Sequence, residues 1–230
     1  MHNKYVSGFK VATASAALLA LAACGDSGEK PADTDAAEAA AEAVETPAVD
    51  VAQQGEGTWG DLVYGDPDAP VTIIEYASLT CPHCATFARV HMPKIKKDYI
   101  DTGKAKLIYR NFIMNRVDIA ASAAARCGND ETTKKLMEVY FARQSDWARS
   151  ANPLDELASL ARRAGISRTQ FDRCVSNDAM LKHLMQMTMG AQKDYNINST
   201  PSFVVNEELV EYRTIDELME KIAEAVADGS

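Results

Sequence analysis

The 230-residue sequence predicts an α/β domain that is interrupted by an all-helical insertion. Segments 70–77, 105–112 and 202–206 are short and rich in apolar, partly β-branched residues, as strands are. The long region 116–194 repeats its apolar residues at helical spacing instead. Residues 214–227 show an amphipathic pattern that predicts a closing helix. Because no internal repeat is present, we expect one α/β core with one insertion rather than a repeat array.

The first half of the predicted core is strand, helix, strand. A "GDPDAP" turn precedes the strand "PVTIIEYA" at 70–77. Residues 87–100, "FARVHMPKIKKDYI", predict a helix that Pro93 kinks, because proline has no N–H for the helical hydrogen bond. The stretch "AKLIYRNF" at 105–112 alternates like a second strand.

The helical region predicts five helices. Gly128, Pro153 and Gly165 mark three of the four breaks between them. The predicted helices cover 116–128, 131–147, 153–164, 167–176 and 178–194. The pattern then returns to a strand, "SFVVN", and "VEY" near 211 adds a short one.

The net charge of −9 is concentrated in the N-terminal quarter of the chain. Segment 25–57 has nine acidic residues and one basic residue, so it carries −8. The folded part, 58–230, carries only −3. Because it has no basic face, the sequence does not favour nucleic acid as a partner.

The first 23 residues predict an export signal. Lys4 and Lys10 form a basic start, and 11–23 is an apolar run that is too short for a comfortable membrane span. The run ends in "LAAC", which resembles the bacterial lipobox and makes Cys24 the expected lipidation site. The alternative is ordinary signal cleavage near Ala22, which would leave Cys24 as a free thiol.

Residues 24–57 then predict an acidic, disordered tether. They are rich in Ala, Glu, Asp and Pro and have hardly any large apolar residue with which to form a core. We therefore expect a lipid-anchored chain that holds its folded domain away from a membrane. The tether cannot serve as a folded dimerisation module.

The motif "CPHC" at 81–84 has several possible chemistries. A c-type haem would need His where Ala85 stands, and zinc usually needs two such cysteine pairs. Copper is a further alternative, because thioether ligands suit Cu(I) and four methionines lie close together, although such spacing is more often packing. These are Met180, Met185, Met187 and Met189. A structural staple over so short a loop would restrict the unfolded chain little.

Disulfide exchange fits the local sequence best. The cysteines follow an apolar strand and begin a helix, so Cys81 is the expected N-cap and Pro82 the first helical residue. Cys84 then lies one turn further on. The free N–H groups of a helix start stabilise a thiolate, and such thiols titrate at about 3.5–7.5 instead of about 8.5. A stabilised thiolate is a good leaving group, which favours an oxidising disulfide.

Around these residues the sequence resembles the DsbA family of thioredoxin-fold proteins, in its lipoprotein form. The resemblance rests on "GDPDAPVTIIEYASLTCPHC", on the helical block and on "TPSF" at 200–203, and it covers 58–228. It weakens at 205–215, where "NEELVEY" lacks a glycine turn. The resemblance implies a thioredoxin fold with an all-helical domain inserted at about 114–194.

The resemblance also implies roles for the motif residues. Cys81 would be the nucleophile and Cys84 the resolving thiol, with no metal or other cofactor. Pro82 and His83 would tune the reduction potential, although His83 could be a mere spacer on an exposed turn.

Two further site predictions follow from the resemblance. Thr200 and Pro201 would form a cis-proline loop that binds an extended substrate peptide. Glu75, six residues before the first cysteine, would be a buried acid that relays the proton of Cys84. The alternative for Glu75 is a solvated strand residue.

Cys127 and Cys174, both in the helical region, are expected to pair in an oxidising compartment. Such a bond would stabilise the fold by about 4 kcal/mol in the chain-entropy model. The alternatives are two separate buried thiols or a second redox couple.

The sequence therefore predicts a monomeric, membrane-tethered dithiol oxidase of the bacterial periplasm. Its substrates would be newly exported, cysteine-containing proteins, and the resemblance implies a quinone-linked membrane partner of the DsbB type. Three rivals remain open: an isomerase or reductase of the same fold, a copper-binding thioredoxin-like chaperone, and a redox-inactive peptide-binding module. Isomerases of this superfamily often carry a folded dimerisation module, which the acidic tail is not, so the oxidase is favoured.

Overall fold

A five-stranded mixed sheet forms the centre of the fold in the computed structural model, which describes residues 57–229. The strand order is β1-β3-β2-β4-β5. The strands are β1 (Leu62–Tyr64), β2 (Val71–Ala77), β3 (Ala105–Asn111), β4 (Ser202–Val205) and β5 (Glu208–Val210). β2 and β3 run parallel, whereas the other neighbours are antiparallel. The thioredoxin-type core predicted from the sequence is therefore present. The predicted tether and lipid-modified cysteine lie outside the described residues.

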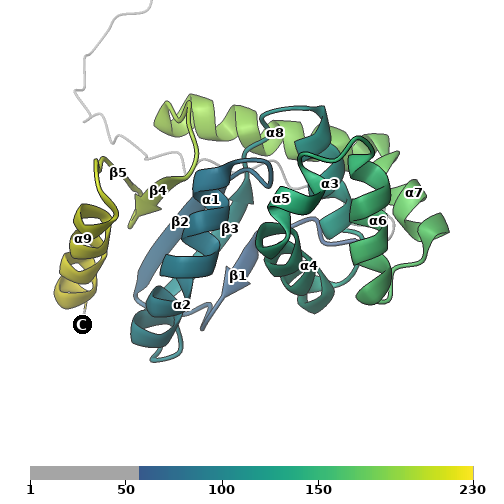
Figure 1. The fold of residues 1–230 in the computed structure, drawn as a ribbon. Coiled ribbons are helices and arrows are strands. Elements are labelled where there is room, and N and C mark those ends of the chain that lie inside the picture. The colour runs from purple at the N-terminus through teal and green to yellow at the C-terminus, as the bar shows by residue number, and fades with distance from the viewer. Residues whose placement is uncertain (1–56, 230) are drawn as a thin grey trace, which may run out of the picture. The chain divides into compact units, whose positions relative to one another are not determined.

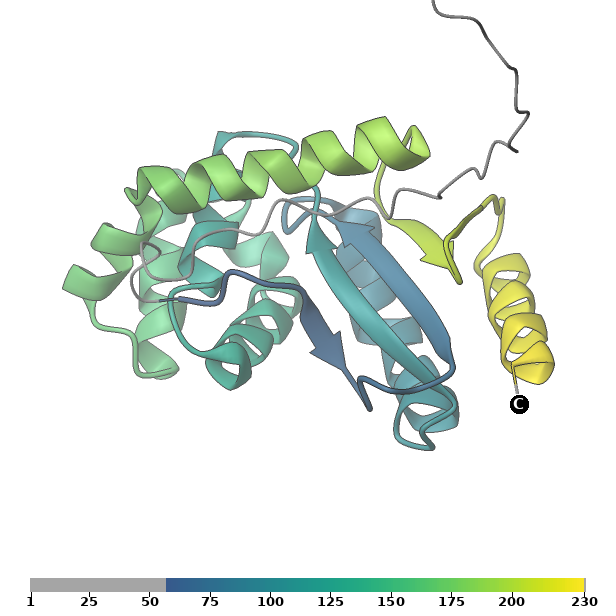
Figure 2. The ribbon, with the colours of Figure 1, turned by 180° about the vertical axis from the view of Figure 1, so that it is seen from behind.

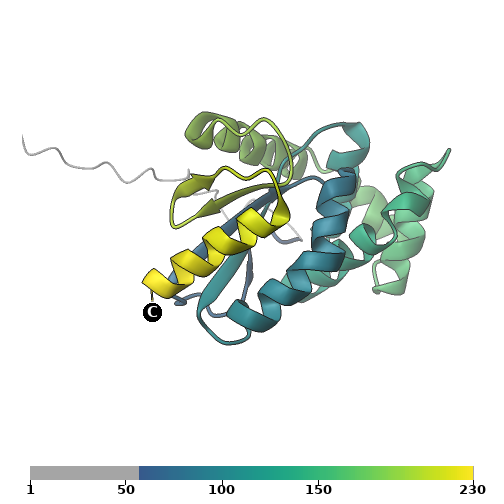
Figure 3. The ribbon, with the colours of Figure 1, turned by 60° about the vertical axis from the view of Figure 1, so that its left-hand side comes forward.

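Side chains of β2 alternate between two buried layers. Ile73 and Ala77 join a large core with α9 (Ile215–Asp228) and the helical segment that follows β2. Tyr76 points to the opposite layer, which is closed by α8 (Asp178–Tyr195). Figure 3 shows α9 beside the helix after β2 on one face, and Figure 2 shows α8 crossing the other. A strand that is buried on both faces explains why β2 is almost entirely apolar.

The helix after β2 is longer and less regular than predicted. It begins at Pro82, as the cysteine motif predicted, continues without a gap into the helix predicted over 87–100, and consists of four consecutive pieces. These are α1 (Pro82–Thr86), the π-helical η2 (Phe87–His91), α2 (Met92–Ile95) and the π-helical η3 (Lys96–Ile100). The N–H of Met92 donates to the carbonyl of Phe87, five residues back. The helix accommodates Pro93, which has no N–H to donate, by widening into the π-helical turns η2 and η3 on either side of it.

The helices of the insertion are α3 (Arg116–Ala125), α4 (Asp130–Ala142), α5 (Gln144–Trp147), α6 (Pro153–Arg163), α7 (Arg168–Val175) and α8. The first five, α3 to α7, gather at the β1 edge of the sheet, and the last, α8, runs from there across one face (Figure 1 and Figure 2). The prediction of one helix over 131–147 was wrong, because the chain breaks at Arg143. The buried indole of Trp147 donates to the carbonyl of Tyr140 at 2.8 Å and holds this break.

β1 was not predicted, and the last strand lies earlier in the chain than predicted. β1 has only three residues, and Val63 pairs opposite Ile108 of β3. β5 ends at 210, and its hairpin turn uses Asn206 and Glu207, whose φ angles are 47° and 70°. Asn206 also bonds both backbone groups of Thr72, at 2.9 and 3.0 Å. Asparagine tolerates the left-handed region well, so a tight turn forms here without glycine.

Candidate active site

Cys81 stands immediately before α1, as predicted from the proline that follows it. Its backbone is extended, with φ −79° and ψ 120°, and Pro82 occupies the first turn of the helix. The N–H of Cys84 donates to the Cys81 sulfur at 3.5 Å. Both cysteines are buried and carry free thiols, so the structure describes the reduced dithiol.

The loop before β4 brings Thr200 and Pro201 against this dithiol. The peptide bond between them is cis. When Cys81 is protonated, its thiol donates to the carbonyl oxygen of Thr200 at 3.3 Å, across 119 positions of sequence. Tyr212 fixes the far side of the loop, because its hydroxyl donates to the carbonyl of Pro201 at 2.7 Å. The residues that were predicted to form one site therefore do lie together.

The two thiols have very different acidities. A hydrogen bond from the Cys84 side chain, together with one from the Thr200 side chain and with backbone donors, lowers the pKa of Cys81 to about 5 despite its burial. Burial, followed by the hydrogen bond to Cys81, raises the pKa of Cys84 far above its usual range. At neutral pH Cys81 is therefore the thiolate and Cys84 keeps its proton.

Glu75 lies in the core beneath the dithiol. Its side chain is only 4% exposed, and its neighbours on β3 and β4 are Tyr109 and Phe203. Burial, and secondarily the charge of Cys81, raises the pKa of this carboxyl to about 8. One carboxyl oxygen has no hydrogen-bond partner among the described residues. The alternative of a solvated strand residue is therefore wrong, and Glu75 is a neutral acid near pH 7.

An open groove runs beside the cysteines. It is lined on one side by His83 and Phe87 of the active-site helix, and on the other by Thr200, Leu209 and Tyr212. His83 is exposed and faces this groove. The groove therefore combines apolar surface with polar loop groups next to the reactive sulfur.

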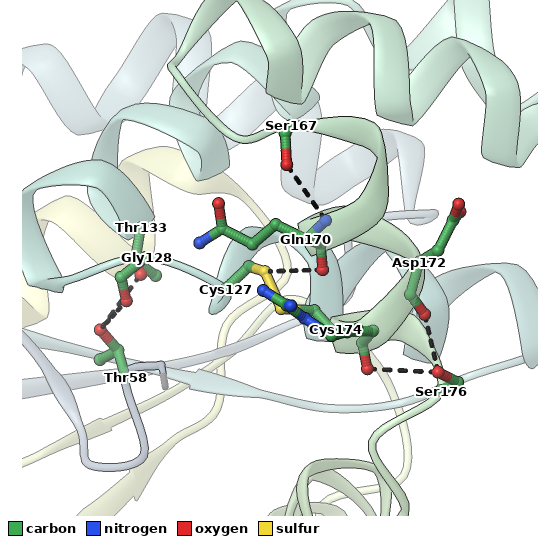
Figure 4. The surroundings of a disulfide bond; sticks show 10 residues. Thr58, Cys127, Gly128, Thr133, Ser167, Gln170, Asp172, Cys174 and Ser176 are labelled. Carbon is green, nitrogen blue, oxygen red and sulfur yellow. Dashed lines mark hydrogen bonds between the residues drawn. A yellow bond between two sulfur atoms is a disulfide. The ribbon is translucent and has the colours of Figure 1, made fainter. Parts of the chain in front are cut away.

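The second pair, Cys127 and Cys174, forms a disulfide in the insertion (Figure 4). Their Cα atoms are 5.6 Å apart, within the normal range for such a bond. Cys127 follows the C-terminal end of α3, and Cys174 lies in the last turn of α7. Close by, the hydroxyl of Thr58 donates to the carbonyl of Gly128 at 3.0 Å, which ties the start of the described chain to the same corner.

The four methionines of the copper alternative do not share one environment. Met180 is buried with Leu184, whereas Met185 and Met189 are exposed on the surface of α8. Within residues 57–229, no group of three or more His, Cys, Asp or Glu side chains could hold a metal ion. The same part of the chain contains no helix that is long and apolar enough to cross a membrane.

Two residues of the insertion contact the loop before Cys81 and were not predicted. Asp118 of α3 accepts the N–H of Leu79 at 2.9 Å, and Gln144 of α5 donates to the carbonyls of Leu79 and Cys81. The place of Asp118 in the first turn of α3 could be predicted from the sequence, because Asn115 three residues earlier caps the helix. No local pattern identifies Gln144, because the helix break that orients its side chain depends on tertiary packing.

A low-pKa cysteine at a helix start, beside a cis-proline loop and on this sheet, defines the thioredoxin superfamily. The comparison with protein families agrees. A family model described as Thioredoxin matches residues 58–224, so the chain belongs to this family.

Within the family, the chain is DsbA-like. The crystal structure of Wolbachia pipientis alpha-DsbA1 superposes with a TM-score of 0.68 at 26% identity, covering 76% of this chain and 94% of that one. A structure titled as a protein-disulfide isomerase, from Novosphingobium aromaticivorans, gives 0.65 at 26% identity, with 73% and 97% covered.

Curated sequences are similar as well. A protein from Rickettsia bellii, provisionally named as a protein-disulfide oxidoreductase, is 31% identical over 170 residues, or 74% of this chain. The chain spans 66% of that relative's length, and 53% of the relative from Rickettsia conorii.

Proposed function

We propose that this chain is a protein thiol:disulfide oxidoreductase that works as a dithiol oxidase. The observation that carries the proposal is the position of the Cys81 sulfur, at the start of α1 and 3.5 Å from the N–H of Cys84. The pKa of about 5 at Cys81 makes its thiolate a good leaving group. The reduced form of the Cys81–Cys84 pair is therefore stabilised relative to its disulfide. The disulfide is readily transferred to another dithiol.

The proposed reaction has two exchange steps. A substrate thiolate attacks the Cys81 sulfur of the oxidised pair, and the bond between the two cysteines breaks as a mixed disulfide forms. Cys84 leaves and takes up a proton, which the neutral carboxyl of Glu75 would supply. A second substrate thiolate then attacks the substrate sulfur of the mixed disulfide. Cys81 leaves as the thiolate, so the substrate dithiol is oxidised to a disulfide and the enzyme disulfide is reduced by two electrons to the dithiol.

The groove beside Cys81 supports an extended peptide as the substrate. It is open along the loop of Thr200 and Pro201 and along the edge strand β5. An edge strand and a loop with free backbone groups suit recognition through main-chain hydrogen bonds, which depends little on sequence. His83 at its rim would tune the thiolate and contact the peptide. Cysteine-containing, unfolded proteins are the proposed substrate class.

The proposed location is the bacterial periplasm. It is supported by the export signal and the lipobox-like "LAAC", which make Cys24 the proposed lipid anchor and residues 24–57 the tether. All of these lie outside the described residues. Reoxidation of the dithiol requires an electron acceptor, and the proposed one is a quinone-linked membrane protein of the DsbB type.

The main alternative within the same chemistry is an isomerase. It is favoured by the similarity to the Novosphingobium structure that is titled as one. The copper-chaperone alternative has less support, because the methionines of α8 are divided between the interior and the surface.

The equilibrium of the Cys81–Cys84 couple with glutathione tests the proposal. The full chain with Cys24→Ser would be used, so that no fifth thiol interferes. A potential near about −120 mV, the known value of DsbA itself, would support a donor of disulfides. A potential near about −270 mV, that of thioredoxin, would make the protein a reductase and contradict the oxidase proposal.

A further inference from the structure

The insertion contacts the active-site loop through one buried amide. Gln144 is the first residue of α5 and only 9% exposed. Its Nε2 donates to the carbonyl of Leu79 at 2.7 Å and to the carbonyl of Cys81 at 2.9 Å. Because both partners can only accept, the end of the amide that faces them must be the NH₂ group. Both of its hydrogens are thus directed at the backbone that carries the reactive cysteine.

This contact is one of several hydrogen bonds that hold the loop before Cys81. The N–H of Leu79 is held by a carboxyl oxygen of Asp118 at 2.9 Å, so both backbone groups of Leu79 are held by side chains of the insertion. The second oxygen of Asp118 accepts the N–H of Met114 at 2.9 Å. The orientation of Gln144 is set in turn by the break between α4 and α5, which Trp147 holds. The insertion therefore determines the position of the loop from two sides.

We infer that Gln144 is a positioning residue through which the helical insertion sets the reactivity of Cys81. The inference rests on the proposed function, and it concerns a residue that touches neither the substrate nor the reacting sulfur atoms. Gln144 would act by holding the Cys81 backbone in its N-cap conformation.

Two physical effects of Gln144 on the Cys81 thiolate act in the same direction. The thiolate is stabilised by donors of the first helical turn, and those donors reach the sulfur only while Cys81 keeps its extended backbone. In addition, the amide hydrogens neutralise the negative ends of two carbonyls close to the sulfur. Without them, the Leu79 carbonyl would lose this donor and the Cys81 carbonyl would keep only the N–H of Ala85, at 3.1 Å, so both would disfavour a nearby negative charge more strongly. Loss of the amide should therefore raise the pKa of Cys81.

Two substitutions at Gln144 and one matched control test this inference. Gln144→Met keeps the size of the side chain and removes both donors, while Gln144→Glu keeps its shape and puts an acceptor against the carbonyls. The control is Tyr140→Phe in α4, which deletes another buried hydrogen bond of the insertion, to the carbonyl of Leu157 at 3.2 Å. All are made in the full chain with Cys24→Ser.

The readouts are the thiolate absorbance as a function of pH and the glutathione equilibrium. Gln144→Met should weaken the oxidising equilibrium roughly three- to tenfold, as expected for one or two buried hydrogen bonds, and should raise the Cys81 pKa accordingly. Gln144→Glu should weaken the oxidising equilibrium and raise the Cys81 pKa by more than Gln144→Met does. Tyr140→Phe should lower the melting temperature without moving either quantity.

A purely structural role for Gln144 would give a different pattern. Then the pKa and the equilibrium would stay at their wild-type values in both Gln144 variants while stability fell, and the inference would be overturned. Should Gln144→Met not fold, Gln144→Glu decides by the same readouts, since its shape is that of the native side chain. Failure of the proposed function is distinguishable, because the parent chain itself would then lack an oxidising equilibrium.

Discussion

Cys81 and Cys84 lie at the beginning of a helix, whereas Cys127 and Cys174 lie at the C-terminal ends of two helices. At a helix start, free N–H groups and the positive end of the dipole favour a thiolate. At a helix end, free carbonyls and the negative end disfavour one. The first pair is therefore suited to release a thiolate, and the second pair is suited to stay bonded.

The two cysteine pairs also differ in the parts of the molecule that surround them. The first pair lies beside an open groove and a cis-proline loop, where we propose that a substrate polypeptide binds. The second pair links α3 and α7 inside the insertion, and no residue that lines the groove comes from these two helices. Two cysteine pairs of one chain can thus have opposite chemistry because their helix ends and their surroundings differ.

The largest effect is expected from the first pair itself. In the chain with Cys24→Ser, Cys81→Ser should reduce disulfide exchange to the rate of the solution background, because the sulfur that a substrate is proposed to attack is gone. Cys84→Ser should instead accumulate a mixed disulfide through Cys81, since no resolving thiol remains. Mass spectrometry of the chain after incubation with an oxidised, cysteine-containing peptide distinguishes them. A mixed disulfide on Cys84 in the Cys81→Ser variant would reverse the proposed roles.

The second expected effect is on the pH profile of alkylation. The pKa of Cys81 lies at about 5, so the rate of its reaction with iodoacetamide should rise through a midpoint near pH 5 and be level by pH 7. Cys84, whose pKa is raised by burial, should stay unmodified over the same range. The Cys81→Ser variant is the control and should lack the low-pH phase. A midpoint near about 8.5 would mean that the helix start does not stabilise the thiolate.

Much of the first pair's environment was predictable from the sequence, because it depends on neighbours in the chain. Cys81, Pro82 and Cys84 form one helix start, and a proline directly after a cysteine indicates where that helix begins. The strand before them was also predictable, since residues buried on both faces read as a continuous apolar run. The position of Pro201 came only from resemblance to a family.

What the sequence did not reveal depends on packing between distant segments. The strand β1 is too short to show a pattern of its own, and it exists because Val63 pairs with β3. The break at Arg143 depends on the burial of Trp147. Gln144 acquires its two carbonyl partners from a loop 63 and 65 residues earlier, which no local pattern encodes.

A smaller effect should follow from removal of the second pair. Replacing Cys127 and Cys174 together by Ala should lower the free energy of unfolding by about 4 kcal/mol, since the bond closes a loop across a sequence separation of 47. Urea unfolding of both forms measures this. Exchange through Cys81 should keep its rate at temperatures where the variant is folded. A large loss of exchange would favour the alternative in which this pair is a second redox couple.

The smallest effect concerns the acid beneath the first pair, and it has the opposite sign. The folded-state pKa of Glu75 is about 8, whereas an unfolded glutamate titrates near 4.5. Between these values the folded chain holds a proton that the unfolded chain has released, so stability falls as pH rises from about 4.5 to about 8. Glu75→Gln removes this loss and should stabilise the protein by on the order of 2 kcal/mol at pH 7.

Urea unfolding at several pH values tests the sign of this prediction. The advantage of Glu75→Gln should vanish near pH 4, where both states hold the proton, and grow toward pH 8. The exposed Glu224 provides the control, because Glu224→Gln should change stability little at any pH. A Glu75→Gln variant that is less stable than the parent at pH 8 would contradict burial as the cause of the raised pKa. The predicted result would mean that the site which exchanges disulfides keeps a buried acid at a cost in stability, whereas the second cysteine pair stabilises the fold.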